Sequence, residues 1–295
     1  MGEGHWSPTI DKHGKKHKIS YLNKRDGIEK LNKNIDKLVT TNEKVLFFVI
    51  CCLFLVTLLL QVLLTAYYAI TFKVNPTPVL SITILLWPLV IGLISNGVFI
   101  GYLGQNSVRV SRAQFADIYE IAQDYSKKLD LKKTPKVYIM QYGGVLNAFA
   151  TRFLFGDIIV IFSDILELAY AQGEDAVRFI IAHELAHVKR KHMSKRLILF
   201  WGLIIPVIGS AYSRACEITC DNIAAYLSDK NPVNGLLVLL AGKKLYSKVK
   251  IDTFLQEAEK EEGFWSWLSE IRSSHPNLST RIRNVSKAKK IISGM

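Results

Sequence analysis

Two long uncharged runs of apolar residues dominate the first third of the chain. The first run is Val45–Phe72 and the second is Val79–Leu103. A helix of about 20 consecutive apolar residues is long enough to cross a bilayer, so each run predicts a transmembrane helix. The link between them, Lys73–Pro78, contains two prolines and has room only for a tight turn. The pattern therefore predicts a transmembrane helical hairpin.

The segment before the first run, residues 1–44, is polar and rich in lysine. Within it, Ile28, Leu31, Ile35 and Leu38 recur at three- and four-residue spacing, which predicts a short amphipathic helix. Such a pattern is compatible with a short coiled coil and equally with a helix that lies on a lipid surface.

After the second run, the pattern changes to that of a folded domain. Apolar positions at helical spacing predict a helix within Ser107–Asp130. Segments rich in β-branched residues predict strands at Lys136–Met140, Val145–Ala150 and Asp157–Ser163, and a helical pattern begins after Gly173. We interpret Val145–Ala150 as a candidate edge strand that could hold an extended peptide, with a core strand as the alternative.

These elements divide the chain into three parts. We expect a cytoplasmic basic segment over residues 1–44, a transmembrane helical hairpin over residues 45–104 and a folded domain over residues 105–295. The expected fold class is α+β and mainly helical, with a small sheet packed beside helices.

Charge and cysteine usage predict where the chain resides. The net charge is +13, and ten Lys and Arg residues lie within residues 1–44. Arg109 and Arg112 follow the second apolar run, whereas the link offers only Lys73. By the positive-inside rule, both termini and the folded domain face the cytoplasm of a multi-pass protein of the cell membrane. No base-reading motif accompanies the charge, so we expect the lipid bilayer and not nucleic acid as a partner. The four cysteines do not form a secreted disulfide framework, which favours a reducing compartment.

The candidate chemistry begins with the sequence His183-Glu184-Leu185-Ala186-His187. Two His residues four positions apart on a helix project from one face, so both imidazoles can bind one metal ion. Glu184 has the position from which a carboxylate can act on a water molecule without being a ligand. The spacing predicts a site for one Zn²⁺ per chain.

A catalytic zinc site typically has three protein ligands, and Glu217 is the best candidate for the third. Asp221 follows one helical turn later, where it could orient a ligating histidine. Cys216 and Cys220 are alternative ligands because thiolates bind zinc well. His192, five residues beyond His187, is predicted to point off the ligand face as a solvated residue at a helix end.

A third apolar stretch, Leu197–Tyr212, separates the His pair from Glu217. The stretch is short for a membrane span and contains Pro206. A single crossing would also leave Glu217 on the opposite side of the membrane from the His pair. The stretch therefore either packs in the core or dips into one leaflet, and we favour the dip because Arg196 and Arg214 flank it.

Two polar residues near the C-terminus, His275 and Arg281, complete the candidate site. A His or Arg near the zinc could stabilise the oxyanion of a tetrahedral intermediate. For His275 the alternative is a polar residue that flanks a helix.

The ordered set of motifs resembles that of the HtpX-like family of integral-membrane zinc metallopeptidases. The resemblance covers residues 107–290 and the preceding hairpin. It rests on Asn147–Thr151, on Asp157–Ser163, on HELAH at 183–187, on Ser-Arg-x-x-Glu at 213–217 with Asp221, and on His275-Pro276 with Arg281. Many relatives have two further spans between the His pair and the third ligand, where this chain has one short apolar stretch.

The resemblance implies a role for each matching residue. Zinc would be held by His183, His187 and Glu217, with Glu184 as the general base. It also implies substrate binding by Asn147, Ala148 and Phe149 on their strand, and roles near the transition state for His275 and Arg281. The folded domain, residues 105–295, would then be a zincin-like metallopeptidase domain.

The sequence therefore predicts a membrane-anchored zinc endopeptidase that hydrolyses peptide bonds at the cytoplasmic membrane face. Its substrates would be proteins or peptides, and the resemblance implies damaged or misassembled membrane proteins, which is a quality-control role. One alternative is a dedicated processing protease for a lipidated or pheromone-like precursor, because the chain is also similar to the CAAX prenyl proteases. Another is a non-catalytic membrane adaptor with a structural metal site, although such sites are usually closed by four Cys or His ligands.

Overall fold

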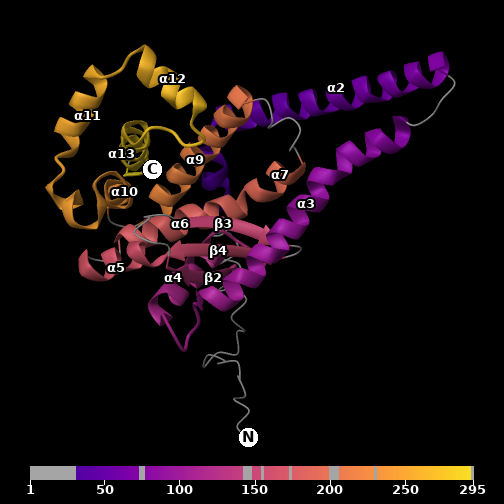
Figure 1. Ribbon diagram of the computed structural model, residues 1–295. Coiled ribbons are helices and arrows are strands. Elements are labelled where there is room, and N and C mark those ends of the chain that lie inside the picture. The colour runs from indigo at the N-terminus through magenta and orange to yellow at the C-terminus, as the bar shows by residue number, and fades with distance from the viewer. Residues whose placement is uncertain are drawn as a thin grey trace, which may run out of the picture.

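The computed structural model describes residues 31–72, 77–141, 148–153, 156–172, 175–198, 206–228 and 231–293. Figure 1 shows a body of helices around a small sheet, from which two long helices, α2 (Thr41–Phe72) and α3 (Thr77–Asn106), project together. The predicted class, α+β and mainly helical, is confirmed.

The sheet has four strands in the order β1 (Val108–Arg109), β2 (Lys136–Met140), β4 (Gly156–Phe162) and β3 (Ala148–Phe153). The central strands β2 and β4 are parallel, and both outer strands run antiparallel to their neighbours. The strand predicted at Lys136–Met140 has the bounds of β2, and the strand predicted at Asp157–Ser163 is β4, shifted by one residue. The candidate strand Val145–Ala150 overlaps β3, which lies at the edge of the sheet; residues 145–147 lie outside the described residues.

The predicted helix within Ser107–Asp130 begins later than expected. Residues Val108–Arg109 form strand β1, and α4 spans only Ala116–Lys128. Phe115, which lies within the predicted helix, adopts a left-handed backbone conformation with φ 61° immediately before α4. A non-glycine residue with positive φ cannot continue a right-handed helix, so the chain turns at this point.

Helix α6 (Asp175–Lys189) lies on one face of the sheet, whereas Leu103 of α3 packs against the other face. Ile159 and Ile161 of β4 pack into one core with Ile181 and Leu185 of α6. Gly235 meets α6 at close range, because a Cβ there would lie 2.6 Å from Cδ1 of Phe179. The other elements are α5 (Ser163–Gln172), α7 (His192–Ile198), α9 (Pro206–Leu227), α10 (Val233–Leu245), η1 (Tyr246–Lys248), α11 (Ile251–Lys260), α12 (Phe264–Arg272) and α13 (Leu278–Ser293).

Helix α2 carries apolar side chains that the body does not cover. Thr41–Thr71 is long and apolar enough to cross a membrane, and it is the one such helix found in the part of the chain that the structure describes. At 32 residues, α2 is about 48 Å long. Leu55, Leu63 and Ile70 are more than half exposed. A water-exposed apolar surface of this size is typical of a membrane-facing helix.

The helix predicted before α2 packs against protein. Residues 31–38 are helical. Ile35 is buried in the core that contains α6, and Leu31 and Leu38 pack against that core at its margin. The expectation of a coiled coil or of a lipid-surface helix is therefore wrong for these residues, because their apolar face is covered by the folded domain.

The apolar stretch Leu197–Tyr212 is divided between two helices. Its first two residues end α7, residues 199–205 lie outside the described residues, and Pro206–Tyr212 begin α9. Tyr212 is fully buried beside Ile50 of α2. This end of the stretch thus packs against the first projecting helix, and a dip into the leaflet stays a prediction for the rest.

Candidate metal centre

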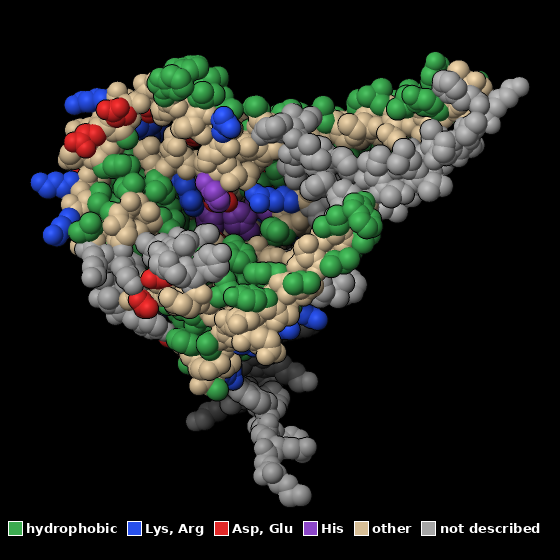
Figure 2. Space-filling model, in the orientation of Figure 1, with side chains coloured by type: hydrophobic (Ala, Val, Ile, Leu, Met, Phe, Trp, Pro, Cys, Tyr) green, Lys and Arg blue, Asp and Glu red, His purple; other side chains and the backbone are tan. Residues whose placement is uncertain are grey.

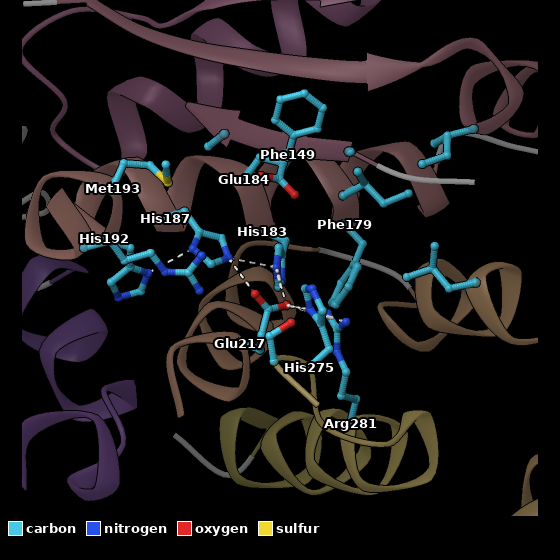
Figure 3. A pocket seen from close by; sticks show the side chains of 17 residues that line it. Phe149, Phe179, His183, Glu184, His187, His192, Met193, Glu217, His275 and Arg281 are labelled. Atoms are coloured by element: carbon cyan, nitrogen blue, oxygen red, sulfur yellow. Dashed lines mark hydrogen bonds and ion pairs between the residues drawn. The ribbon is translucent and has the colours of Figure 1, made fainter. Parts of the chain in front are cut away.

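Helix α6 presents His183 and His187 on one face, one turn apart. Their Nε2 atoms lie 3.2 Å from each other. From α9, Glu217 places Oε2 3.4 Å from Nε2 of His183 and Oε1 3.4 Å from Nε2 of His187. Figure 3 shows both rings and the carboxylate pointing toward one place between α6 and α9. The structure thus brings together the three residues that the sequence indicated as metal ligands.

The spacing of these three donors fits a zinc ion. Ligand bonds of about 2.0–2.1 Å in a tetrahedral site give ligand-to-ligand distances of about 3.3–3.4 Å. The three observed distances, 3.2, 3.4 and 3.4 Å, lie close to that range. Two imidazoles and one carboxylate are also a donor set found in hydrolytic zinc enzymes. These residues could therefore hold zinc.

Behind His183, Asp221 and Arg281 form a buried ion pair. Oδ1 of Asp221 lies 2.9 Å from Nδ1 of His183, which turns Nε2 of that ring toward Glu217. From α13, Arg281 donates two hydrogen bonds of 2.7 Å to the Asp221 carboxylate. Asp221 is 0% exposed and Arg281 is 7% exposed. Each charge would be costly alone at this depth, so the pairing is what allows Asp221 to stay ionised behind the ring.

The carboxylates determine the protonation of the site. Burial alone would lower the pKa of His183, but Asp221 and Glu217 outweigh this effect and raise that pKa to about 10. Burial would raise the pKa of Glu217, but hydrogen bonds from His183, His187 and His275 hold it well below its usual value. Glu217 is thus ionised at neutral pH, as a metal ligand must be.

Glu184 lies on the side of α6 nearer the sheet. In Figure 3 its carboxylate lies beside Phe149, away from Glu217. Glu184 is 6% exposed, and this burial raises its pKa although both neighbouring histidines lower it. A backbone hydrogen bond from Ala150 ties the carboxylate to β3. A carboxylate with a raised pKa is suited to accepting and returning a proton near neutral pH.

A cavity of about 420 Å³ joins these groups to the edge strand. Ala148, Phe149 and Ala150 of β3 line it together with Glu184 and the histidines. In Figure 2 the histidine side chains lie in a hollow with Lys or Arg side chains on both sides. Ala148 and Phe149, which were expected to bind substrate, therefore line the same cavity as the candidate metal ligands; Asn147 lies outside the described residues.

His275 and Arg281 approach Glu217 in different ways. Nδ1 of His275 lies 3.2 Å from Oε2 of Glu217, although 64% of the His275 side chain is exposed. Nη1 of Arg281 lies 3.6 Å from the same oxygen, while its other nitrogens bind Asp221. The structure thus places His275 at the open side of the site and Arg281 in its interior.

The expectation for His192 is wrong. His192 is 1% exposed, and its Nδ1 lies 2.9 Å from Nδ1 of His187. The helix that carries the His pair ends at Lys189, and Lys191 adopts a left-handed conformation with φ 54°. This turn directs His192 back toward His187, a change that a continuous helical pattern does not reveal.

The two alternative ligands, Cys216 and Cys220, are both fully buried. Sγ of Cys220 lies 3.7 Å from Nδ1 of His192, and Cys216 groups with His192 and Glu43. Burial raises the pKa of Cys216 to about 12 and that of Cys220 well above its usual value. Both thiols are therefore protonated at neutral pH, and both lie beside His192.

The residues of the site lie in a part of the chain that is similar to a known protein family. The model of peptidase family M48 matches residues 112–209 and 197–289, which include every residue of the site described above except Glu43. A search of curated proteins found no match.

The raised pKa of His183 predicts proton release when zinc binds. Zinc binds the neutral ring, so at pH 8 it must displace about one proton from a group whose pKa is about 10. A histidine with the ordinary pKa of about 6.5 would release almost none. Apparent zinc affinity should also rise with pH up to about pH 10, because the competing proton is lost. Calorimetry in buffers of different ionisation enthalpy measures the release.

Asp221→Asn provides the control for this measurement. The substitution removes one of the two carboxylates that raise the pKa of His183, so it should reduce the proton release at pH 8. Any other source of protons contributes equally to both proteins. Equal release from the wild type and the variant would contradict the assignment.

Proposed function

Because the chain belongs to peptidase family M48 and is a metalloprotease, we propose that it is a zinc endopeptidase acting at the cytoplasmic face of a membrane. One observation carries the proposal. His183, His187 and Glu217 place three donor atoms 3.2–3.4 Å apart, and Glu184 lines the same cavity from the side of the sheet. Three ligands leave a fourth position for substrate or water.

A zinc ion at this position would polarise the scissile carbonyl group and make a bound water molecule more acidic. Glu184 accepts a proton from the attacking water and passes it to the leaving amine. Its raised pKa favours the first transfer, because a more basic carboxylate takes the proton of the water more readily. Asp221 keeps the His183 ring in its ligating orientation, and Arg281 acts as a positioning residue by keeping Asp221 ionised.

Strand β3 supplies the substrate-binding surface in this proposal. It lies at one edge of the sheet, beside β4, and no other described strand pairs with its outer side. An extended peptide can pair with such an edge and present its scissile bond to Glu184 and the candidate metal ligands, which line the same cavity. Ala148 and Phe149 contact the peptide in this arrangement, and Asn147 precedes them on the same segment. His275, at the exposed side, would exchange its contact with Glu217 for a hydrogen bond to the carbonyl oxygen.

The projecting helices support a membrane location. Apolar side chains of α2 are exposed along its length, and α3 meets it at the far end of the pair. We propose that both helices cross the membrane, which makes the protein multi-pass with its termini in the cytoplasm. This anchor would keep the catalytic domain beside membrane-protein substrates, in quality control or, as the alternative, in the processing of a lipidated or pheromone-like precursor.

Glu184→Gln should separate metal binding from catalysis. The amide cannot accept the proton, so we expect casein cleavage by the purified protein to fall by at least about 100-fold. Zinc content should stay near one ion per chain, because the three ligands are unchanged. Glu259→Gln, on the exposed face of α11, provides the matched control and should cleave at the wild-type rate.

Cleavage by the wild type should also stop when a chelator removes the metal. A Glu184→Gln protein that still cleaves casein would refute the assignment of the base. Zinc binding without any cleavage by the wild type would instead favour a non-catalytic adaptor.

Thiol labelling tests the proposed orientation. In a variant whose four native cysteines are replaced by alanine, a cysteine at Asn75, in the link between the helices, should react with a membrane-impermeant maleimide added outside intact cells. A cysteine at Ser247, which is exposed on the folded domain, should react only after the cells are opened. Labelling of Ser247→Cys in intact cells would place the domain on the other side of the membrane.

A further inference from the structure

A row of polar contacts leads from the metal site to the first projecting helix. Nδ1 of His187, the nitrogen that faces away from Glu217, lies 2.9 Å from Nδ1 of His192. On the other side of that ring, Nε2 of His192 lies 3.2 Å from Oε1 of Glu43, in the first turn of α2. His192 and Glu43 are each 1% exposed, so water does not compete for these contacts. Figure 3 shows His192 beside His187, on the side away from His183.

The chemistry of the two rings permits one assignment of protons along this row once a metal is bound. Nε2 of His187 must offer its lone pair to the metal, so the proton of this neutral ring is on Nδ1. That N–H donates to Nδ1 of His192, 2.9 Å away, which must therefore be unprotonated. His192 then carries its proton on Nε2 and donates it to the Glu43 carboxylate. Each donor meets an acceptor, and the row ends on a negative charge.

Other contacts fix Glu43 at the end of the row. Arg190 donates hydrogen bonds of 3.2 and 2.9 Å to Oε1 of Glu43, and Nζ of Lys195 lies 3.6 Å from the same oxygen. These two cations also count against a second metal ion between Glu43, His192 and Cys216, because a further positive charge would meet repulsion there. The cluster is therefore better suited to orienting a ligand than to binding its own metal.

We propose that His192 and Glu43 are positioning residues of the metal centre, and that they couple the first membrane helix to it. The inference rests on the proposed zinc site. Partners that orient a ligating histidine raise its basicity and fix its tautomer, and their loss commonly weakens metal binding by about 10–100-fold. Asp221 does this for His183 from within the folded domain. Glu43 does it for His187, through His192, from the helix that anchors the protein.

The start of α2 is attached to the helix that carries Glu217. Oγ1 of Thr40 accepts a hydrogen bond of 3.3 Å from the N–H of Glu43, as at a helix N-cap. The N–H of Thr40 donates in turn to Oγ1 of Thr219 on α9, at 3.1 Å. Binding free energies are reciprocal, so if the position of α2 affects zinc affinity, zinc must stabilise the attachment of α2 by the same amount.

The test measures zinc affinity of the full chain in detergent micelles, by competition with a chromophoric chelator. His192→Leu removes both contacts, and we expect zinc to bind about 10–100-fold more weakly. His192→Gln keeps a donor for Glu43 and an acceptor for His187, and it should recover most of the loss. Glu43→Gln, which keeps the shape but removes the charge, should fall between the two.

Val137→Ala is the matched control. It shortens a buried side chain of β2 and removes no contact of the row or of the attachment of α2, so it should lower the melting temperature of the metal-free protein and leave zinc affinity close to wild type. As a second measurement, zinc should slow amide hydrogen exchange at the start of α2 in the wild type, and much less in His192→Leu. This protection reports coupling directly, even if the variants are less stable.

The outcomes separate this inference from the proposed function. Wild-type affinity in His192→Leu, or equal weakening in His192→Leu and His192→Gln, would overturn the positioning role. A large loss of affinity in Val137→Ala would overturn it too, because general loosening would then explain the effect. Failure of the wild type to bind zinc would instead overturn the proposed zinc site itself.

Discussion

The interior of this protein depends on the burial of charged groups that must compensate one another. Glu217, Asp221 and Arg281 are each at most 7% exposed, and they lie around His183 between α6, α9 and α13. A single uncompensated charge at this depth costs several kcal/mol. Burial of these charged groups is therefore favourable only when all of them are in place. The three helices must pack correctly for the candidate metal ligands to come together.

This constraint explains how the elements are arranged around the site. Helix α6 supplies both histidines and the candidate base, and it packs with its apolar side against β4, which fixes its distance from the edge strand β3. Helix α9 supplies Glu217 and Asp221 one turn apart and also contacts the start of α2. The same two helices thus connect the proposed substrate-binding edge, the candidate metal ligands and the proposed membrane anchor.

Local patterns predicted the parts of the site that depend on local geometry. The pair His183 and His187 lies on one helical face because residues four apart do, and the same spacing places Asp221 one turn after Glu217 on one face of α9. Strands β2 and β4 were visible as runs of β-branched residues. Strand β1 was missed because two residues are too few to give a periodic pattern.

The sequence could not predict features that depend on where the chain turns or on what covers a face. The turn at Lys191 requires a left-handed conformation that nothing in its residue type indicates, so the place of His192 was missed. The apolar face of residues 31–38 was visible, but periodicity does not say whether protein or lipid covers such a face. The contact of Glu43 with His192 spans 149 positions in the chain and leaves no local pattern.

X-ray absorption spectroscopy of the zinc-loaded protein tests the central assignment most directly, because it reports the atoms bound to the metal. Binding by His183, His187 and Glu217 predicts a first shell of nitrogen and oxygen only, at about 2.0–2.1 Å, with the scattering pattern of two imidazole rings. A sulfur atom at about 2.3 Å would show that Cys216 or Cys220 binds the metal. That result would contradict the assignment of Glu217 as the third ligand.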